Sequence, residues 1–368
     1  MKPSPLIFTA VIIALTLFGC PPPPTALRLA GAPVCDASGN LNPVPFLAQP
    51  FTPGEPYDQS PQPDSAPINA DIQSDLTAAF NAAPPFFKTQ LCGLKGIYIN
   101  QKGCTGYDPS TCNLSDSDIA DNSWGFRKYP AGEEYIAISL GLWKNNASNP
   151  WSCPGSQRIC APPFQTYQTR LLGALLKTLA PSAPPNLHPP QFVNVSQNTG
   201  AMSVLATLAH EFGHIYWYDS FVIDPNTGAP NPGGPAVTTR FCGGTFYPPG
   251  SWSRSVDVPL HRWIGFGQLR DQLPGSEILQ IQNFLGRGDF PNAGDHLHNV
   301  YASGRWASAL AAFSPDEEYV ETFELFVLTN ANPPEIFQVQ IYGHPPDPIP
   351  HLLKTRCFQQ ALCPTCSL

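Results

Sequence analysis

Five consecutive residues, His210 to His214, carry the clearest chemical pattern in this chain. His210 and His214 enclose Glu211, Phe212 and Gly213, which gives the form H-E-x-x-H. Residues four apart lie on one face of a helix, so both imidazoles can bind one metal ion. Glu211 would lie beside that ion, where a carboxylate can accept a proton from water. The pattern therefore predicts metal-assisted hydrolysis.

The residues around this motif predict a helix from Ala201 to Tyr218 that would position it. Four of its apolar side chains fall within an arc of about 80°, opposite to the histidines. These four are Leu205, Leu208, Phe212 and Ile215. The alternative is an amphipathic helix whose two histidines lie in the core or on the surface without a metal. Trp217 and Ser220 stand where a metzincin has a Gly and a third His, so a third ligand must come from elsewhere.

A second helix is predicted over residues 314–326, where Ser314 suits the N-cap and Pro follows at the first helical position. Glu317, Glu321 and Glu324 share one face of it. We expect Glu317 to be the third metal ligand and Glu321 to accept the free N–H of a ligating imidazole. If Glu317 instead forms a capping box with Ser314, Glu321 becomes the ligand. Glu324 is expected to be solvated or ion-paired.

The two motifs together resemble a known arrangement. His-Glu-Phe-Gly-His, followed about a hundred residues later by a Glu-x-x-x-Glu helix, is similar to the gluzincin metallopeptidases, and in particular to the catalytic module of the anthrax lethal factor family. The resemblance implies Glu317 as the third zinc ligand and Glu321 behind it. The family tyrosine that assists the oxyanion falls on Leu310, so Tyr301 is a substitute for that role.

The N-terminus indicates export. Residues 6–18 form a short apolar run behind one Lys, and Leu-Phe-Gly-Cys20 is similar to a bacterial lipobox. Cys20 would then be lipidated and anchor the protein to the cell envelope, with the outer membrane favoured. An ordinary signal peptide cleaved near Gly19, giving a periplasmic or secreted protein, or an uncleaved anchor, are the alternatives.

The cysteine count agrees with an oxidising compartment. Eleven Cys are present, and ten remain when Cys20 is set aside. An even number in an exported protein predicts disulfides, up to five here. Cys104 with Cys112, and Cys153 with Cys160, would close short loops. The Cys363-Pro-Thr-Cys366 segment also has the spacing of a redox or zinc site, but a disulfide is favoured because no second such pair accompanies it.

Composition narrows the classes of partner. Only 12% of the residues are charged and the formal net charge is −8, which argues against a nucleic-acid partner. The 45 Pro and 29 Gly indicate long, loop-rich connections. After residue 20 no stretch is long and apolar enough to cross a membrane.

We expect four segments along the chain. Residues 1–20 are the lipoprotein signal, 21–72 a Pro-rich tether, 73–335 the catalytic domain, and 336–368 a Cys-containing tail. The expected fold class is α+β, with a mixed sheet, an active-site helix and disulfide-stapled loops, as the zincin resemblance implies.

Several further elements are predicted from local patterns. Strands are expected at 96–100 and 135–143, and the second alternates as a half-buried strand would. In zincins such a strand lines the cleft with its edge, although an ordinary core strand fits as well. Helices are expected at residues 70–81, 166–179 and 276–285. His296 and His298 are alternative ligands or transition-state donors.

These observations predict an exported zinc metalloendopeptidase that acts on peptide or protein substrates. Two other classes fit the sequence. One is a surface lipoprotein that binds a partner on a zincin scaffold without catalysis, and the other is a structural zinc protein of the cell envelope. Zinc content and cleavage assays separate the three.

Overall fold

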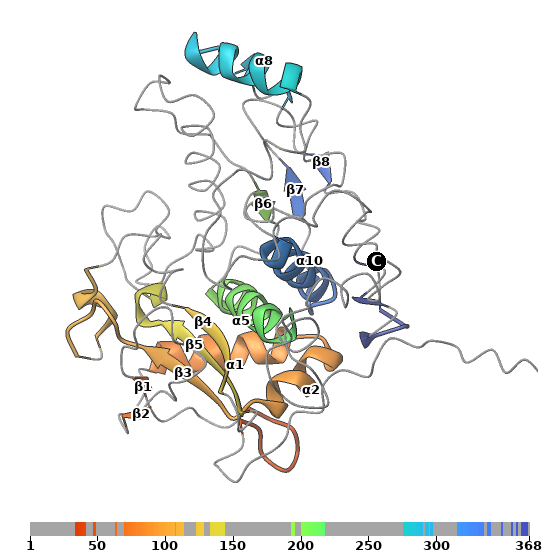
Figure 1. Ribbon diagram of the computed structural model, residues 1–368. Helices are drawn as coiled ribbons and strands as arrows, with labels where there is room; N and C mark the ends of the chain where they lie inside the picture. The colour runs from red at the N-terminus through yellow and green to blue at the C-terminus, as the bar shows by residue number, and fades with distance from the viewer. Residues whose placement is uncertain are drawn as a thin grey trace, which may run out of the picture.

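The fold is described from a computed structural model of the chain (Figure 1). The structure describes residues 34–41, 47–48, 63–64, 70–106, 108–113, 123–128, 133–143, 193–195, 200–217, 275–289, 291–293, 295–296, 315–334, 337–339, 347–348, 355, 358–359 and 362–366. Several predictions lie outside these residues: the signal segment with Cys20, the Cys153/Cys160 pair, the helix at 166–179, His298, Tyr301, Leu310 and Ser314.

Helices and strands are mixed, so the expected α+β class is confirmed at that level. The main sheet has five strands in the order β2-β1-β3-β5-β4. β1 (Leu47–Ala48), β3 (Gly96–Asn100) and β5 (Glu133–Ser139) run parallel. β2 (Pro63–Asp64) and β4 (Trp124–Lys128) pair antiparallel at the two edges.

The strand expected at 135–143 differs from its prediction in two ways. It spans Glu133–Ser139, and Leu140–Trp143 forms a 3-10 turn, η2. It also pairs on both sides, with β3 and β4, so its edge is not free to bind a peptide. Among the described strands, β4 is the edge strand next to β5, and β2 forms the opposite edge.

The strand β5 is also buried on both faces, not on one. Ile136 and Ile138 are fully buried as expected, but so are the small residues Ala137 and Ser139. Ala137 lies in a cluster with Tyr98 and Tyr135, whose stacked rings are 5.6 Å apart. Small residues alternate with large ones here because aromatic side chains of the sheet cover that face.

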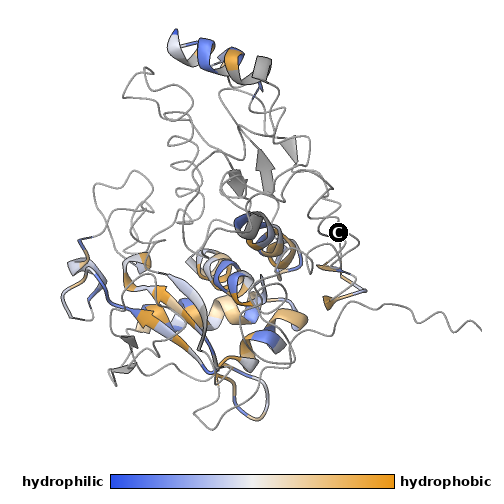
Figure 2. Ribbon diagram, in the orientation of Figure 1, coloured by the Kyte–Doolittle hydropathy of each residue, from blue (hydrophilic) through white to orange (hydrophobic). Residues whose placement is uncertain are grey.

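Helix α5 (Gly200–Trp217) is the central helix of the molecule. It packs against α1 (Ala70–Ala82), α10 (Pro315–Thr329) and the edge strand β4 (Figure 1). The helix expected at 70–81 is confirmed as α1, and the two motif-bearing helices are confirmed as α5 and α10. Figure 2 shows the apolar residues gathered along β3, β5 and the helices packed beside them.

Aromatic rings join the helices. Phe87 of α2 (Pro85–Gly93) lies edge-on to Phe212 of α5 and to Phe323 of α10, with ring centroids 5.7 and 5.8 Å apart. Phe358, near the C-terminus, also contacts Phe323, at 5.4 Å. All four rings are buried, which holds α5 and α10 at a fixed spacing.

Three disulfides are found among the described residues. Cys104–Cys112 and Cys363–Cys366 are confirmed as predicted. The third, Cys35–Cys92, joins a segment of the predicted tether to the end of α2. Together with the pairing of β1 to β3, it ties the described part of that segment to the folded unit. These disulfides are compatible with an exported protein.

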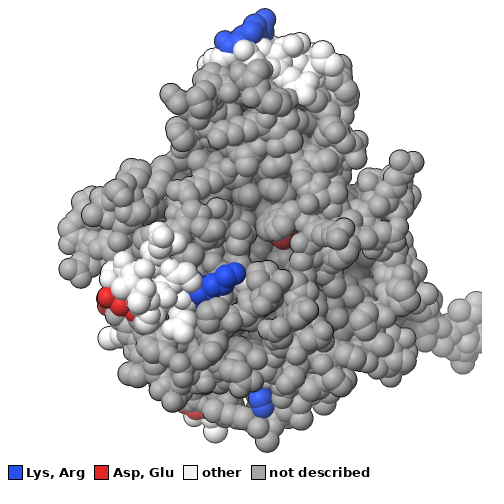
Figure 3. Space-filling view, turned by 60° about the vertical axis from the view of Figure 1, so that its left-hand side comes forward, with Lys and Arg blue, Asp and Glu red and all other residues white. Residues whose placement is uncertain are grey.

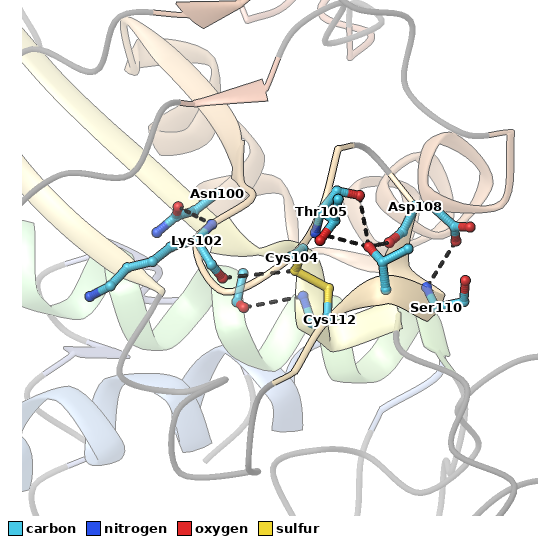
Figure 4. The surroundings of a disulfide bond; sticks show 10 residues. Asn100, Lys102, Cys104, Thr105, Asp108, Ser110 and Cys112 are labelled. Carbon is cyan, nitrogen blue, oxygen red and sulfur yellow. Dashed lines mark hydrogen bonds between the residues drawn. A yellow bond between two sulfur atoms is a disulfide. The ribbon is translucent and has the colours of Figure 1, made fainter.

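The Cys104–Cys112 disulfide closes the loop that follows β3 (Figure 4). Within this loop, Thr111 Oγ1 donates to the Thr105 carbonyl at 2.8 Å, and Asp108 accepts the Ser110 N–H at 2.9 Å. The loop therefore holds its shape through its own polar groups as well as the cross-link.

A second, antiparallel sheet of three strands lies apart from the first. It consists of β6 (Val193–Val195), β7 (Phe337–Val339) and β8 (Asp347–Pro348). The helix expected at 276–285 is confirmed as α8 (Gly275–Gly286). Of the helices described, none has the length and apolar character that a bilayer crossing requires. The described charged side chains on the face shown in Figure 3 are scattered and form no basic patch there.

Candidate metal centre

The two motif histidines lie on the side of α5 that faces α10. The apolar side of α5, with Leu205, Leu208 and Ile215, is buried. His210 and His214 are only partly buried, with 17% and 23% of their side-chain surface exposed. Their Nε2 atoms are 3.2 Å apart, and the two rings are nearly perpendicular. Both imidazoles thus present a nitrogen to one point in space.

Glu317 of α10 completes this group. Its Oε2 lies 3.7 Å from His210 Nε2, and its Oε1 lies 3.7 Å from His214 Nε2. The three residues form a cluster that could hold a metal ion. Glu317 is buried at the first turn of α10 and points across to α5.

The spacing of these donors suits a small, strongly coordinating cation. Bonds of about 2.0–2.1 Å to a tetrahedral zinc ion place neighbouring donor atoms about 3.3 Å apart. The observed separations of 3.2 and 3.7 Å lie close to that value. Two imidazoles and one carboxylate are also a common donor set of catalytic zinc sites, which leave a fourth position open. The residues present therefore fit such an ion.

Glu321 lies behind His210. The Nδ1–H of His210 donates to Glu321 Oε1 at 2.7 Å, so Nε2 is the nitrogen left for a metal. This is the arrangement expected for Glu321. It fixes both the tautomer and the orientation of the ring.

Of the two alternatives predicted for Glu324, solvated or ion-paired, the structure supports the second. Glu324 is 1% exposed, so it is not solvated, and its Oε2 lies 3.5 Å from His210 Nδ1, within ion-pair distance. Burial, and then the charge of Glu321, raise the pKa of Glu324 well above its usual range. The α10 helix turns this residue inward because it occupies the same face as Glu317 and Glu321.

His210 is strongly affected by these carboxylates. Burial lowers its pKa, but hydrogen bonds to Glu321 and Glu324 and the charge of Glu317 outweigh burial and raise the pKa well above its ordinary value. Without a metal, the imidazole is therefore held as a cation among carboxylates.

Glu211 follows His210 in α5 and contacts the edge strand β4 at Gly125. It is 6% exposed, and burial raises its pKa to about 7, against the opposing effects of His210 and of a hydrogen bond from the Gly125 backbone N–H. A carboxylate whose pKa lies near neutrality is suited to exchange protons with water. Glu211 is therefore a candidate for such proton exchange.

The other histidine candidate lies elsewhere. His296 stacks on Phe284 of α8, with ring centroids 5.7 Å apart, and is not part of the group formed by His210, His214 and Glu317. One residue of the site had no signal in the sequence: Gly125, on a strand that was not predicted. The glycine and the two basic residues of β4 weaken the alternating pattern that marks a strand.

Comparison of the chain with models of protein families, with curated proteins and with solved structures returned no match, so the argument for its chemistry depends on the site itself.

Proposed function

We propose that the protein is an exported zinc metalloendopeptidase with a zincin-like catalytic domain, which hydrolyses peptide bonds of peptide or protein substrates. The observation that carries the proposal is the convergence of His210, His214 and Glu317, with Glu211 on the same helix and beside them. The proposal includes anchoring through Cys20 to the cell envelope.

Each residue of the site has a separate role in the proposed reaction. His210, His214 and Glu317 would hold zinc, and Glu321 keeps the His210 ring in place through its 2.7 Å contact. Zinc, when bound, supplies a Lewis acid that polarises a carbonyl oxygen and makes water more acidic. Glu211 accepts the proton of the attacking water and later passes it to the leaving amine.

The position of the edge strand β4 favours a peptide as the substrate. Among the described strands β4 pairs on one side only, and it packs against α5, the helix that carries Glu211. An extended peptide can add to such an edge. A peptide bound there would pass close to the base.

The test is a comparison of the secreted form beginning after Cys20 with its Glu211→Gln variant. We expect both to bind about one zinc and only the parent to cleave a diverse peptide library. Glu277→Gln, the same change on the remote helix α8, is the matched control and should leave cleavage unchanged.

Two outcomes would overturn the proposal. A parent that binds zinc but cleaves no peptide supports a binding or structural protein. A parent that binds no zinc means that the three-residue cluster is not a metal site.

A further inference from the structure

Helix α5 and strand β4 come into direct contact at Gly125 and Glu211. A methyl group built on Gly125 would lie 1.6 Å from the backbone oxygen of Glu211 and 2.5 Å from its carbonyl carbon. Both are backbone atoms, so no side-chain rotation can relieve the overlap. Only glycine allows the edge strand to lie this close to the motif helix.

The same residue supplies a hydrogen bond. The backbone N–H of Gly125 donates to the Glu211 carboxylate. In the register of the two strands, Gly125 lies opposite Ile136 of β5. The side-chain clearance and the donor therefore belong to the same residue.

Few other contacts named here restrain the Glu211 side chain. Its side chain has three rotatable bonds, and its other named neighbours are His210 and Glu321, which act on it through charge. A base must stay within hydrogen-bond reach of the proton that it accepts. A directional bond from the strand backbone provides that restraint.

We infer that Gly125 is a positioning residue that fixes the Glu211 carboxylate through its backbone N–H. This inference rests on the proposed function for its kinetic consequence. The hydrogen bond itself is tested without activity or metal.

The direct test is amide exchange at Gly125, measured by NMR in the metal-free protein. Glu211→Ala removes the acceptor, so we expect the Gly125 amide to exchange at least about tenfold faster than in the parent, while the amides of β5 keep their rates. Equal Gly125 rates in the two proteins would overturn the inference, whatever the protein does.

The kinetic test uses Gly125→Ala, with Gly96→Ala as its control. A methyl group at Gly96 would also overlap a neighbour, the Tyr98 ring at 2.7–2.9 Å, but Gly96 lies on β3 and not against Glu211. We expect Gly125→Ala to lower kcat by about 10- to 100-fold, the range of a hydrogen bond to a charged group. KM should stay within about threefold, and Gly96→Ala should keep the parent's kcat.

Glycolic acid in place of Gly125 is the second variant. It replaces the N–H by an ester oxygen and adds no methyl group, so it removes the donor while the clearance remains. A similar fall in kcat is expected even if Gly125→Ala does not fold.

If the parent cleaves peptides and the folded, zinc-loaded ester variant keeps the parent's kcat, the inference fails while the proposed function stands. If the parent cleaves nothing, the proposed function fails, and amide exchange still decides on the hydrogen bond.

Discussion

Gly213 of α5 lies directly against Val320 of α10, and this contact sets the distance between the two helices that carry the metal-capable residues. A methyl group on Gly213 would be 3.1 Å from both the Cα and the Cγ1 atoms of Val320. His214 follows Gly213 in the chain, and Glu317 lies one turn before Val320. Because the two helix backbones approach closely here, the side chain of Glu317 is long enough to reach both imidazoles.

Gly213→Ala should therefore separate the helices. We expect a loss of about 1–3 kcal/mol in the free energy of unfolding and zinc affinity weaker by at least about tenfold, measured by urea unfolding and by chelator competition. Adding Val320→Ala removes Cγ1 and should restore part of both losses, which a double-mutant cycle detects. Additive effects of the two changes would contradict this account.

Glu321 and Glu324 give a matched pair of Glu→Gln variants. Both approach His210 Nδ1, at 2.7 and 3.5 Å, and the shorter distance makes the Glu321 contact the stronger hydrogen bond. We expect Glu321→Gln to weaken zinc binding by about 10- to 100-fold, and Glu324→Gln to change it by less than about threefold. Isothermal titration with zinc measures both, and equal losses would show that the carboxylates act as one unit.

Much of the site could be predicted because its signals are local. The motif of His210 to His214 has helical spacing, and the carboxylates of α10 share a face, so the sequence predicts which helices meet. The inward position of Glu324 could not be predicted, because an acidic residue at the end of a helical stripe is solvated in most proteins. Only the packing of α10 against α5 shows that this stripe is buried.

The sheet was predicted less well for a different reason. β3 and β5 are apolar enough to be recognised, but β1 and β2 are two-residue strands and β4 has no clear alternation. Their pairing depends on long-range contacts, such as the Cys35–Cys92 disulfide, which no local pattern specifies. The edge strand and Gly125 were missed for this reason.

Glu211 should make the stability of the metal-free protein depend on pH. Its pKa of about 7 in the fold exceeds the ordinary value of 4.5, so the folded state holds an extra proton between those pH values. The resulting stabilisation is complete below pH 4.5 and is lost as the pH rises through 7. At about 1.4 kcal/mol per pKa unit, the loss amounts to about 3 kcal/mol.

Urea unfolding of chelator-treated protein at pH 4.5 and pH 8 tests this dependence. The parent should lose about 3 kcal/mol more than Glu211→Gln over that interval, because the amide does not titrate. Parallel pH profiles for the two proteins would show that Glu211 titrates near its ordinary pKa.

Metal binding should release protons. The pKa of His210 is raised well above its ordinary value by its carboxylate neighbours, and zinc binds only the neutral imidazole. At pH 6.5 we expect the release of about one proton or more per zinc, and affinity that increases with pH. Calorimetric titrations in two buffers of different ionisation enthalpy give this number, and a heat that does not vary with the buffer would contradict it.

Asp75 of α1 connects three elements at the start of the motif helix. Its carboxylate accepts the indole N–H of Trp143 at 3.1 Å and lies beside Gly200, the first residue of α5, where an added methyl group would be 2.9 Å from Oδ2. Asp75 is 6% exposed, so it is a buried acceptor placed at the positive end of the helix dipole.

The variants Asp75→Asn and Asp75→Ala separate the contribution of the Trp143 hydrogen bond from that of the negative charge at the start of α5. Asn keeps an oxygen for Trp143 but loses the charge, and we expect a loss of about 0.5–1 kcal/mol. Ala also leaves the indole without an acceptor and should lose about 2–3 kcal/mol, seen as a lower midpoint in urea. Trp143→Phe removes the donor together with part of the ring, and in its background the Ala and Asn variants should differ less. Because Asp75 acts at the first turn of α5, three turns before His210, these variants should lower stability while a folded, zinc-loaded protein keeps the zinc affinity of the parent. A weaker affinity in Asp75→Asn would mean that the start of α5 also determines the geometry of the histidine pair.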